Sequence, residues 1–116
     1  MTPDELRART KVFALRVVKL YRSLPRTADA QVIGKQLLRC GTSVGANYRA
    51  TCRARSRPEF VAKLGIVVEE ADEAIDWLEM LIDAGIVGEK RLKDLLAEAH
   101  ELTAMFTAAQ HTARRR

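Results

Sequence analysis

Apolar residues recur along this chain every three to four positions, the spacing that places them on one face of an α-helix. The longest regular stripe consists of seven apolar residues: Phe60, Leu64, Val67, Ala71, Ile75, Leu78 and Ile82. Three short breaks, each with polar residues, proline or glycine, interrupt the periodicity. The pattern therefore predicts four helices, over residues 3–24, 28–54, 57–84 and 88–112.

Local start and stop signals support these boundaries. Thr2 followed by Pro3 and Glu5 forms a capping box, with the proline at the first helical position, where its missing N–H costs nothing. The pair Leu24–Pro25 ends the first helix, because a residue that precedes proline avoids the helical region. A second capping pattern opens at Ser56 and marks the start of the third helix.

Four amphipathic helices of roughly 20–27 residues with short connections predict an all-α fold, an antiparallel up-down-up-down four-helix bundle. The length of 116 residues suits one domain, so residues 1–116 are expected to form a single bundle. A strand over 61–68 is the alternative, but the flanks of this run continue at helical period without a turn signal. No stretch approaches about 18 uninterrupted apolar residues, so we expect no membrane span and no membrane partner.

Three glycines, Gly34, Gly41 and Gly45, form a second stripe within the second helix. Each costs about 1 kcal/mol relative to alanine in a helix interior, so something must approach the helix closely at these positions. Tight packing against another helix is the favoured interpretation. Approach of a ligand is the alternative, but no phosphate-binding loop pattern accompanies the glycines.

The third helix carries further apolar residues off its main stripe, at Ile66, Trp77 and Met80. A helix that is apolar on more than one face must bury more than one face, which a monomeric bundle does not require. We therefore expect Ile66, Trp77 and Met80 to lie at a subunit interface of a homo-oligomer.

The charges are distributed unevenly along the chain. It has 20 Lys and Arg residues against 15 Asp and Glu residues, a formal net charge of +5. Residues 25–57 hold seven basic groups and one acidic group, whereas residues 58–87 hold one basic group and eight acidic groups. Four cations of the second helix fall within an arc of roughly 80° opposite its apolar stripe, and two more follow it. The six are Lys35, Arg39, Arg49, Arg53, Arg55 and Arg57.

Two interpretations of these six cations stay open. One is contact with several phosphates of a nucleic acid, with an affinity that depends steeply on salt. The other is pairing with the acidic stripe of a neighbouring subunit, which consists of Asp72, Asp76, Glu79 and Asp83. No aromatic residues interleave with the cations, so stacking of single-stranded bases is not expected. No helix-turn-helix or zinc-finger spacing predicts base-specific contacts.

No residue pattern predicts catalysis, a metal site or a cofactor. The two histidines, His100 and His111, lack the Glu-x-x-His spacing of di-iron bundles. Cys40 lies on the apolar stripe, where a thiol is usually inert, and Ser43 has no histidine near it in the sequence. Cys40 and Cys52 would lie about 18 Å apart on one helix, too far for a disulfide. We expect a non-enzymatic protein with free thiols in the reducing cytoplasm.

The segment from Gln36 to Tyr48, QLLRCGTSVGANY, resembles the signature of small four-helix-bundle proteins called the 23S rRNA intervening-sequence or S23 family. The later run Arg55–Phe60 continues the resemblance, which covers roughly residues 8–110. The signature residues that match here include Ser43, Gly45 and Asn47. Many members have an acidic residue and a glycine after the asparagine, where this chain has a basic residue, Arg49.

The resemblance implies an antiparallel bundle that assembles into a ring, commonly a pentamer. It also implies a relation to accessory proteins of diversity-generating retroelements, which bind a reverse transcriptase and nucleic acid. The genes of the family occur within inserted segments of ribosomal RNA genes and elsewhere, and for most members the biochemical function is unknown.

Together, the residues and the resemblance predict a homo-oligomer, with a pentamer favoured, whose basic surface contacts structured RNA or DNA. The alternative is a scaffold that docks a protein partner and binds no nucleic acid. Reversing the charges of Arg49 and Arg53 distinguishes the two, because only the first interpretation requires them to face phosphates.

Overall fold

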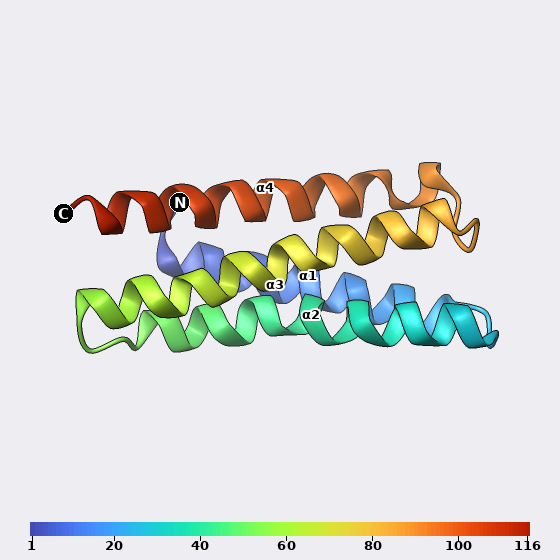
Figure 1. Ribbon diagram of the computed structural model, residues 1–116, viewed down its shortest axis with the longest axis horizontal. Helices are drawn as coiled ribbons and strands as arrows, with labels where there is room; N and C mark the ends of the chain where they lie inside the picture. Colours follow the sequence, from blue (N-terminus) through green and yellow to red (C-terminus); the bar gives the residue numbers. More distant parts are fainter.

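The computed structural model describes all residues from 1 to 116. Consecutive helices run antiparallel (Figure 1), and they are α1 (Pro3–Ser23), α2 (Ala28–Cys52), α3 (Arg57–Asp83) and α4 (Glu89–Arg114). No strand is present, so the predicted all-α four-helix bundle is confirmed. Both termini lie at the end of the bundle that holds the α2–α3 connection (Figure 1). None of the four helices has the combination of length and apolar character that crossing a bilayer requires.

The helix ends follow the local signals and fall within two residues of the expected ranges. The Thr2 hydroxyl accepts from the Glu5 N–H at 3.1 Å, and the Glu5 carboxylate accepts from the Thr2 N–H at 3.3 Å, which completes the capping box. Ser56 caps α3 by accepting from the Glu59 N–H at 3.2 Å. The Glu59 carboxylate, however, accepts from the N–H of Arg55 rather than from that of Ser56.

The apolar stripes of all four helices meet in one core along the axis of the bundle. Every helix contributes large, fully buried side chains to it, among them Phe13, Leu37, Leu64, Leu78, Leu102 and Phe106. The ring of Tyr48 packs against that of Phe106, with 5.2 Å between the ring centroids. Burial of one such side chain stabilises the fold by about 1.5–3 kcal/mol, so the core holds the four helices together.

The three glycines of α2 allow α1 and α2 to approach closely. A Cβ atom on Gly41 would lie 2.9 Å from a methyl carbon of Val17. A Cβ atom on Gly34 would lie 2.6 Å from a methyl carbon of Leu24, the residue that caps the C-terminal end of α1. A Cβ atom on Gly45 would lie 3.1 Å from Oγ1 of Thr10. These spacings leave little or no room for a larger residue in a close-packed interior. The packing interpretation of the glycine stripe is therefore confirmed.

The helices α1 and α4 are the least closely packed neighbours in the bundle. Arg9 of α1 joins them through two hydrogen bonds to the Glu98 carboxylate, of 2.7 Å from Nε and 2.6 Å from Nη2. Arg91 of α4 donates to the Ser23 hydroxyl at 2.6 Å. A bidentate arginine–carboxylate pair fixes the relative orientation of the two groups as well as their distance, so it helps to set the register of α1 against α4.

Candidate nucleic-acid interface

The six cations predicted to contact nucleic acid all have exposed side chains. Three follow the outer face of α2, two lie in the α2–α3 connection and one opens α3: Lys35, Arg39, Arg49, Arg53, Arg55 and Arg57. The structure thus places them in a line that runs from the first third of α2 to the end of the bundle that holds both termini.

Arg39 differs from the other five because α3 supplies it with two carboxylates. Its guanidinium forms an ion pair with Glu70 at 3.3 Å and a second one with Glu73. The hydrogen bond to Glu73 raises the pKa of Arg39 above its usual value. Both partners belong to the same chain, and neither belongs to the acidic stripe that the sequence suggested as a partner. The charge of Arg39 is therefore largely offset within the bundle.

The other five cations have no carboxylate partner within the chain. Glu59 follows Arg57 by two residues, but its carboxylate accepts from the backbone N–H of Arg55 at 2.7 Å and lies 3.9 Å from the ammonium group of Lys63. The guanidinium groups of Arg55 and Arg57 are consequently left to the solvent or to a ligand.

Two cations of α1 join this surface, and the sequence pattern did not reveal them. Arg7 and Lys11 face Arg49 across the contact between α1 and α2, where the three side chains line one groove. A signal was present, because residues 1–24 hold six basic groups against two acidic ones. The sequence alone does not predict how α1 is rotated relative to α2, and the glycine contacts fix this rotation.

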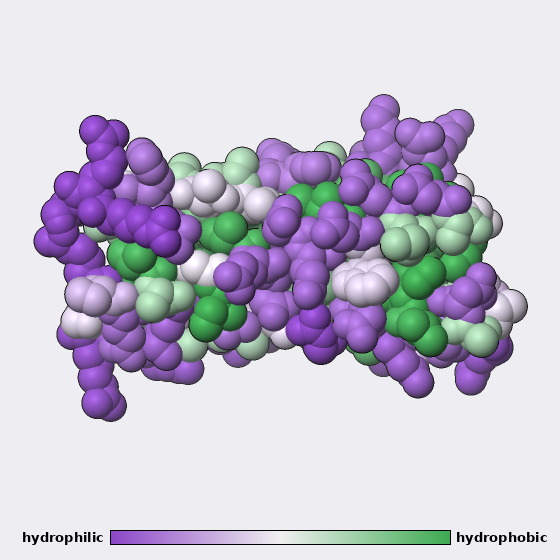
Figure 2. All heavy atoms as spheres, viewed as in Figure 1, coloured by the Kyte–Doolittle hydropathy of each residue, from purple (hydrophilic) through white to green (hydrophobic).

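The end of the bundle that holds both termini is strongly basic. Arg57 and Arg116 line one hollow at this end. The 47 residues nearest this end, 1–12, 47–68 and 104–116, carry eleven Lys and Arg residues against three Asp and Glu residues, whereas the remaining 69 carry nine against twelve. The most hydrophilic side chains project from this end in Figure 2, on the left. The bundle is therefore polarised along its axis, with the basic face of α2 leading to its basic end.

The three residues predicted at a subunit interface lie on the outer side of α3. Ile66 and Met80 are 45% and 46% exposed. Trp77 packs partly against the core, and its indole Nε1 is buried without a hydrogen-bond partner in the chain. The helical spacing places all three on the face of α3 that also carries Glu70 and Glu73.

The signature residues of α2 form hydrogen bonds within the helix itself. The Ser43 hydroxyl donates to the carbonyl oxygen of Arg39 at 2.7 Å, and Asn47 Nδ2 donates to the carbonyl oxygen of Ser43 at 2.9 Å. The Thr51 hydroxyl donates to the carbonyl oxygen of Asn47 at 2.8 Å. Gly45 lies against α1. In the single chain these residues serve the helix and its packing.

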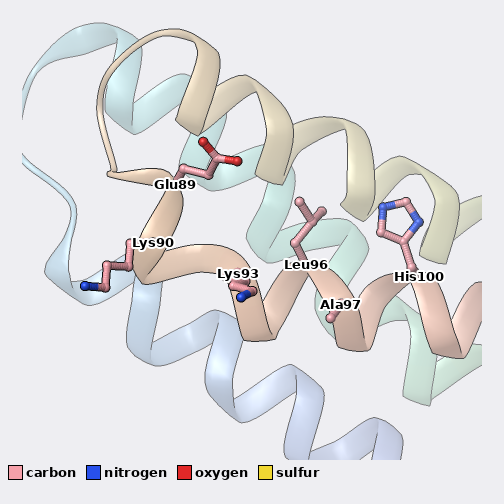
Figure 3. A pocket seen from close by; sticks show the side chains of 6 residues that line it. All are labelled: Glu89, Lys90, Lys93, Leu96, Ala97 and His100. Carbon is pink, nitrogen blue, oxygen red and sulfur yellow. The ribbon is translucent and has the colours of Figure 1, made fainter.

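The two cysteines and the histidines are the remaining candidates for chemistry in the chain. Cys40 is buried, and burial raises the pKa of its thiol to about 12, whereas Cys52 is exposed. His100 lines an open hollow whose six lining residues all come from α4 (Figure 3). Glu89 and Leu96 point to the same side of the helix as His100, while Lys90 points away. No group of three or more His, Cys, Asp or Glu side chains is placed to hold a metal ion.

Comparison with known proteins relates the whole bundle to one family. The model of the family described as 23S rRNA-intervening sequence protein matches residues 5–108. The chain is also similar to a crystal structure of a protein of unknown function from the S23 ribosomal protein family of Bacteroides thetaiotaomicron VPI-5482. The two chains are 32% identical, with a TM-score of 0.88 over 96% of this chain and 99% of the other. No curated protein matches the chain.

Proposed function

The chain belongs to the family of 23S rRNA-intervening sequence proteins, and we propose that it is a non-enzymatic accessory protein whose basic surface binds the phosphate backbone of structured RNA or DNA. It needs no cofactor, and it acts in the cytoplasm as a homo-oligomer, a pentameric ring. The observation that carries the proposal is the row of exposed cations along α2 and the α2–α3 connection that have no carboxylate partner in the chain.

Unpaired surface cations favour phosphates because binding releases the counterions condensed on the nucleic acid. The cations that supply this contact are Lys35, Arg49, Arg53, Arg55 and Arg57, with Arg7 and Lys11 from α1. Contacts to phosphates position a nucleic acid without reading its sequence. The expected binding is therefore independent of base sequence and strongly dependent on salt.

The proposed ring rests on the outer face of α3. Ile66 and Met80 leave apolar surface exposed there, and the buried Nε1 of Trp77 has no acceptor within the chain. Packing of a second subunit on this face would cover the apolar surface of Ile66 and Met80. A ring repeats the basic surface of each subunit, so several copies contact one nucleic acid at a high effective concentration.

The test is the double charge reversal Arg49→Glu with Arg53→Glu, measured with a structured RNA and a duplex DNA at 50 mM salt. We expect the affinity to fall by at least about 100-fold, while the mass of the assembly, measured by light scattering, stays unchanged. Lys90→Glu with Lys93→Glu is the matched control, since it makes the same change in net charge on exposed positions of α4. An equal loss in the control would mean that net charge alone governs binding.

A different outcome would favour the alternative, a scaffold that docks a protein partner. The feature of the structure that suits it is the exposure of apolar side chains away from α3, at Val12, Leu15 and Val32. In that case the wild-type protein binds neither nucleic acid at low salt, and the double reversal changes the assembly or its partner contacts instead.

A further inference from the structure

A groove runs between α1 and α2 at the half of the bundle nearer the termini. Its volume is about 190 Å³. Ala14 of α1 and Gly45 and Ala46 of α2 line it, and their side chains are too short to fill it. The floor lies close to both backbones, since a Cβ atom on Gly45 would lie 3.1 Å from the Thr10 hydroxyl oxygen. The small residues that let the helices approach therefore also leave a permanent hollow outside their contact.

The rim of this groove carries three cations and no carboxylate. They are Arg7 and Lys11 of α1 and Arg49 of α2. Lys11 and Arg49 form no ion pair within the chain. Arg7 forms one with Asp4, which lies one turn earlier with a side chain that is 87% exposed. Exposed pairs of this kind contribute little to stability, so the Arg7 guanidinium can exchange Asp4 for a more highly charged anion.

The hydroxyl groups in the groove offer no further donors. Thr10 donates its hydrogen to the carbonyl oxygen of Arg7 at 2.9 Å, and Thr42 donates its hydrogen to that of Leu38 at 2.7 Å. The donors that face a ligand are therefore the ammonium and guanidinium groups of the rim. Such a set suits phosphate oxygens and lacks the mixed donors and acceptors that reading a base edge requires.

The volume of the groove limits the size of the group that it can bind. Pockets that enclose a whole small molecule usually measure about 300–1,000 Å³, so a groove of this volume takes a smaller group. Arg7 and Ala14 lie seven residues apart on α1, which is about 10 Å along the helix axis. That length is enough for two neighbouring phosphates of one strand.

We propose that the α1–α2 groove is a phosphodiester-backbone site, in which one strand of RNA or DNA lies along the groove with its bases pointing away from it. Arg7 and Lys11 on one wall and Arg49 on the other contact neighbouring phosphates, and the short side chains of Gly45 and Ala46 allow the strand to lie close to the helices. This inference rests on the proposed function and adds the place and the geometry of the contact.

The test fills the groove without changing any charge. Ala46 is exposed on the rim, and Ala46→Phe occupies the space that the strand needs. Ala108→Phe is the matched control, because Ala108 is also exposed but lies on α4. The probes are fluorescein-labelled 20-mers of single-stranded and duplex RNA and DNA, measured by anisotropy, and thermal unfolding verifies that both variants keep the wild-type fold.

We expect Ala46→Phe to weaken binding of every probe that the wild-type protein binds by at least 10-fold, and Ala108→Phe to leave it unchanged. Lys11→Gln is a second, independent readout, since loss of one phosphate contact lowers the slope of log affinity against log salt by about 0.7–0.9. The four probes show whether RNA or DNA, single or paired, supplies the strand.

The results separate this inference from the proposed function. If Ala46→Phe and Lys11→Gln bind as the wild type does while the double reversal Arg49→Glu with Arg53→Glu abolishes binding, the nucleic acid lies on α2 and outside the groove, and the inference is wrong. If the wild-type protein binds none of the four probes at 50 mM salt, both the proposed function and the groove are refuted.

Discussion

The two edges of α2 carry cations of the same kind in opposite surroundings. On the edge toward α3, Arg39 meets the carboxylates of Glu70 and Glu73. On the edge toward α1, Arg49 meets Arg7 and Lys11 across a groove that no carboxylate lines. The helix next to α2 decides what each cation can bind, because α3 is acidic where α1 is basic. Position on α2 alone does not distinguish a structural arginine from one available to a ligand.

The largest effect is expected where α1 packs against α2. Gly41→Leu forces a side chain into a position where even a Cβ atom would lie 2.9 Å from Val17, and Val17 is fully buried. We expect a loss of about 3 kcal/mol in the free energy of unfolding, at the upper end of the usual range for overpacking. Because the groove lies between the same two helices, we also expect nucleic-acid binding to weaken.

Gly65→Leu is the matched control for this substitution on α3. A Cβ atom on Gly65 would meet only the far end of the Gln110 side chain, at 2.8 Å, beside an open hollow. The Gln110 side chain can move aside at the cost of its hydrogen bond to the Val61 carbonyl oxygen, and the change removes a glycine from a helix interior, so we expect a net effect within about 1 kcal/mol. Urea unfolding followed by circular dichroism measures both variants, and equal losses would contradict a special role for the α1–α2 contact.

A smaller effect separates the two edges directly. Arg49→Gln removes a cation without a partner, so we expect binding of nucleic acid to weaken by about 3–10-fold with little change in stability. Arg39→Gln removes two solvent-screened ion pairs, so we expect only a small loss of stability and a loss of less than about 2-fold in binding. Anisotropy titrations measure the binding of both variants, and urea unfolding measures their stability. Equal weakening of binding would contradict the distinction between the edges.

The smallest perturbation uses the two thiols of α2 as reporters. Burial raises the pKa of Cys40 to about 12, so its thiol stays protonated at pH 8 and is shielded from reagents. Cys52 is exposed one turn after Arg49. We expect a thiol reagent to label Cys52 rapidly and Cys40 only after unfolding in guanidinium. Bound nucleic acid should slow the labelling of Cys52 several-fold, whereas an unchanged rate would place the nucleic acid away from this turn.

The helices could be predicted from the sequence because their signals are local. The capping box of Thr2 and Glu5, the break at Pro25 and the cap at Ser56 each act within four residues of the position they mark. The apolar periodicity needs only the geometry of a single helix. The glycine stripe also correctly predicted close packing against another helix, but it did not predict that this helix is α1.

The surroundings of the cations could not be predicted in the same way. Pairing of Arg39 with Glu70 and Glu73 depends on how far α2 and α3 are rotated about their own axes, which no spacing within either helix reveals. The presence of Arg7 and Lys11 beside Arg49 depends in turn on the register of α1 against α2. Both are set by packing in the core and at the glycines, and they appear only when the helices are assembled.

The most direct test of a phosphate-binding surface is the salt dependence of nucleic-acid binding by the wild-type protein. Anisotropy of a labelled structured RNA, a single-stranded RNA and a duplex DNA is titrated with nuclease-treated protein at 50 and 200 mM salt. For about six phosphate contacts, we expect the affinity to fall by roughly 1,000-fold between the two conditions. Absence of binding to all three at 50 mM salt would contradict the account, since it would mean that the unpaired cations of α2 and α1 do not face phosphates.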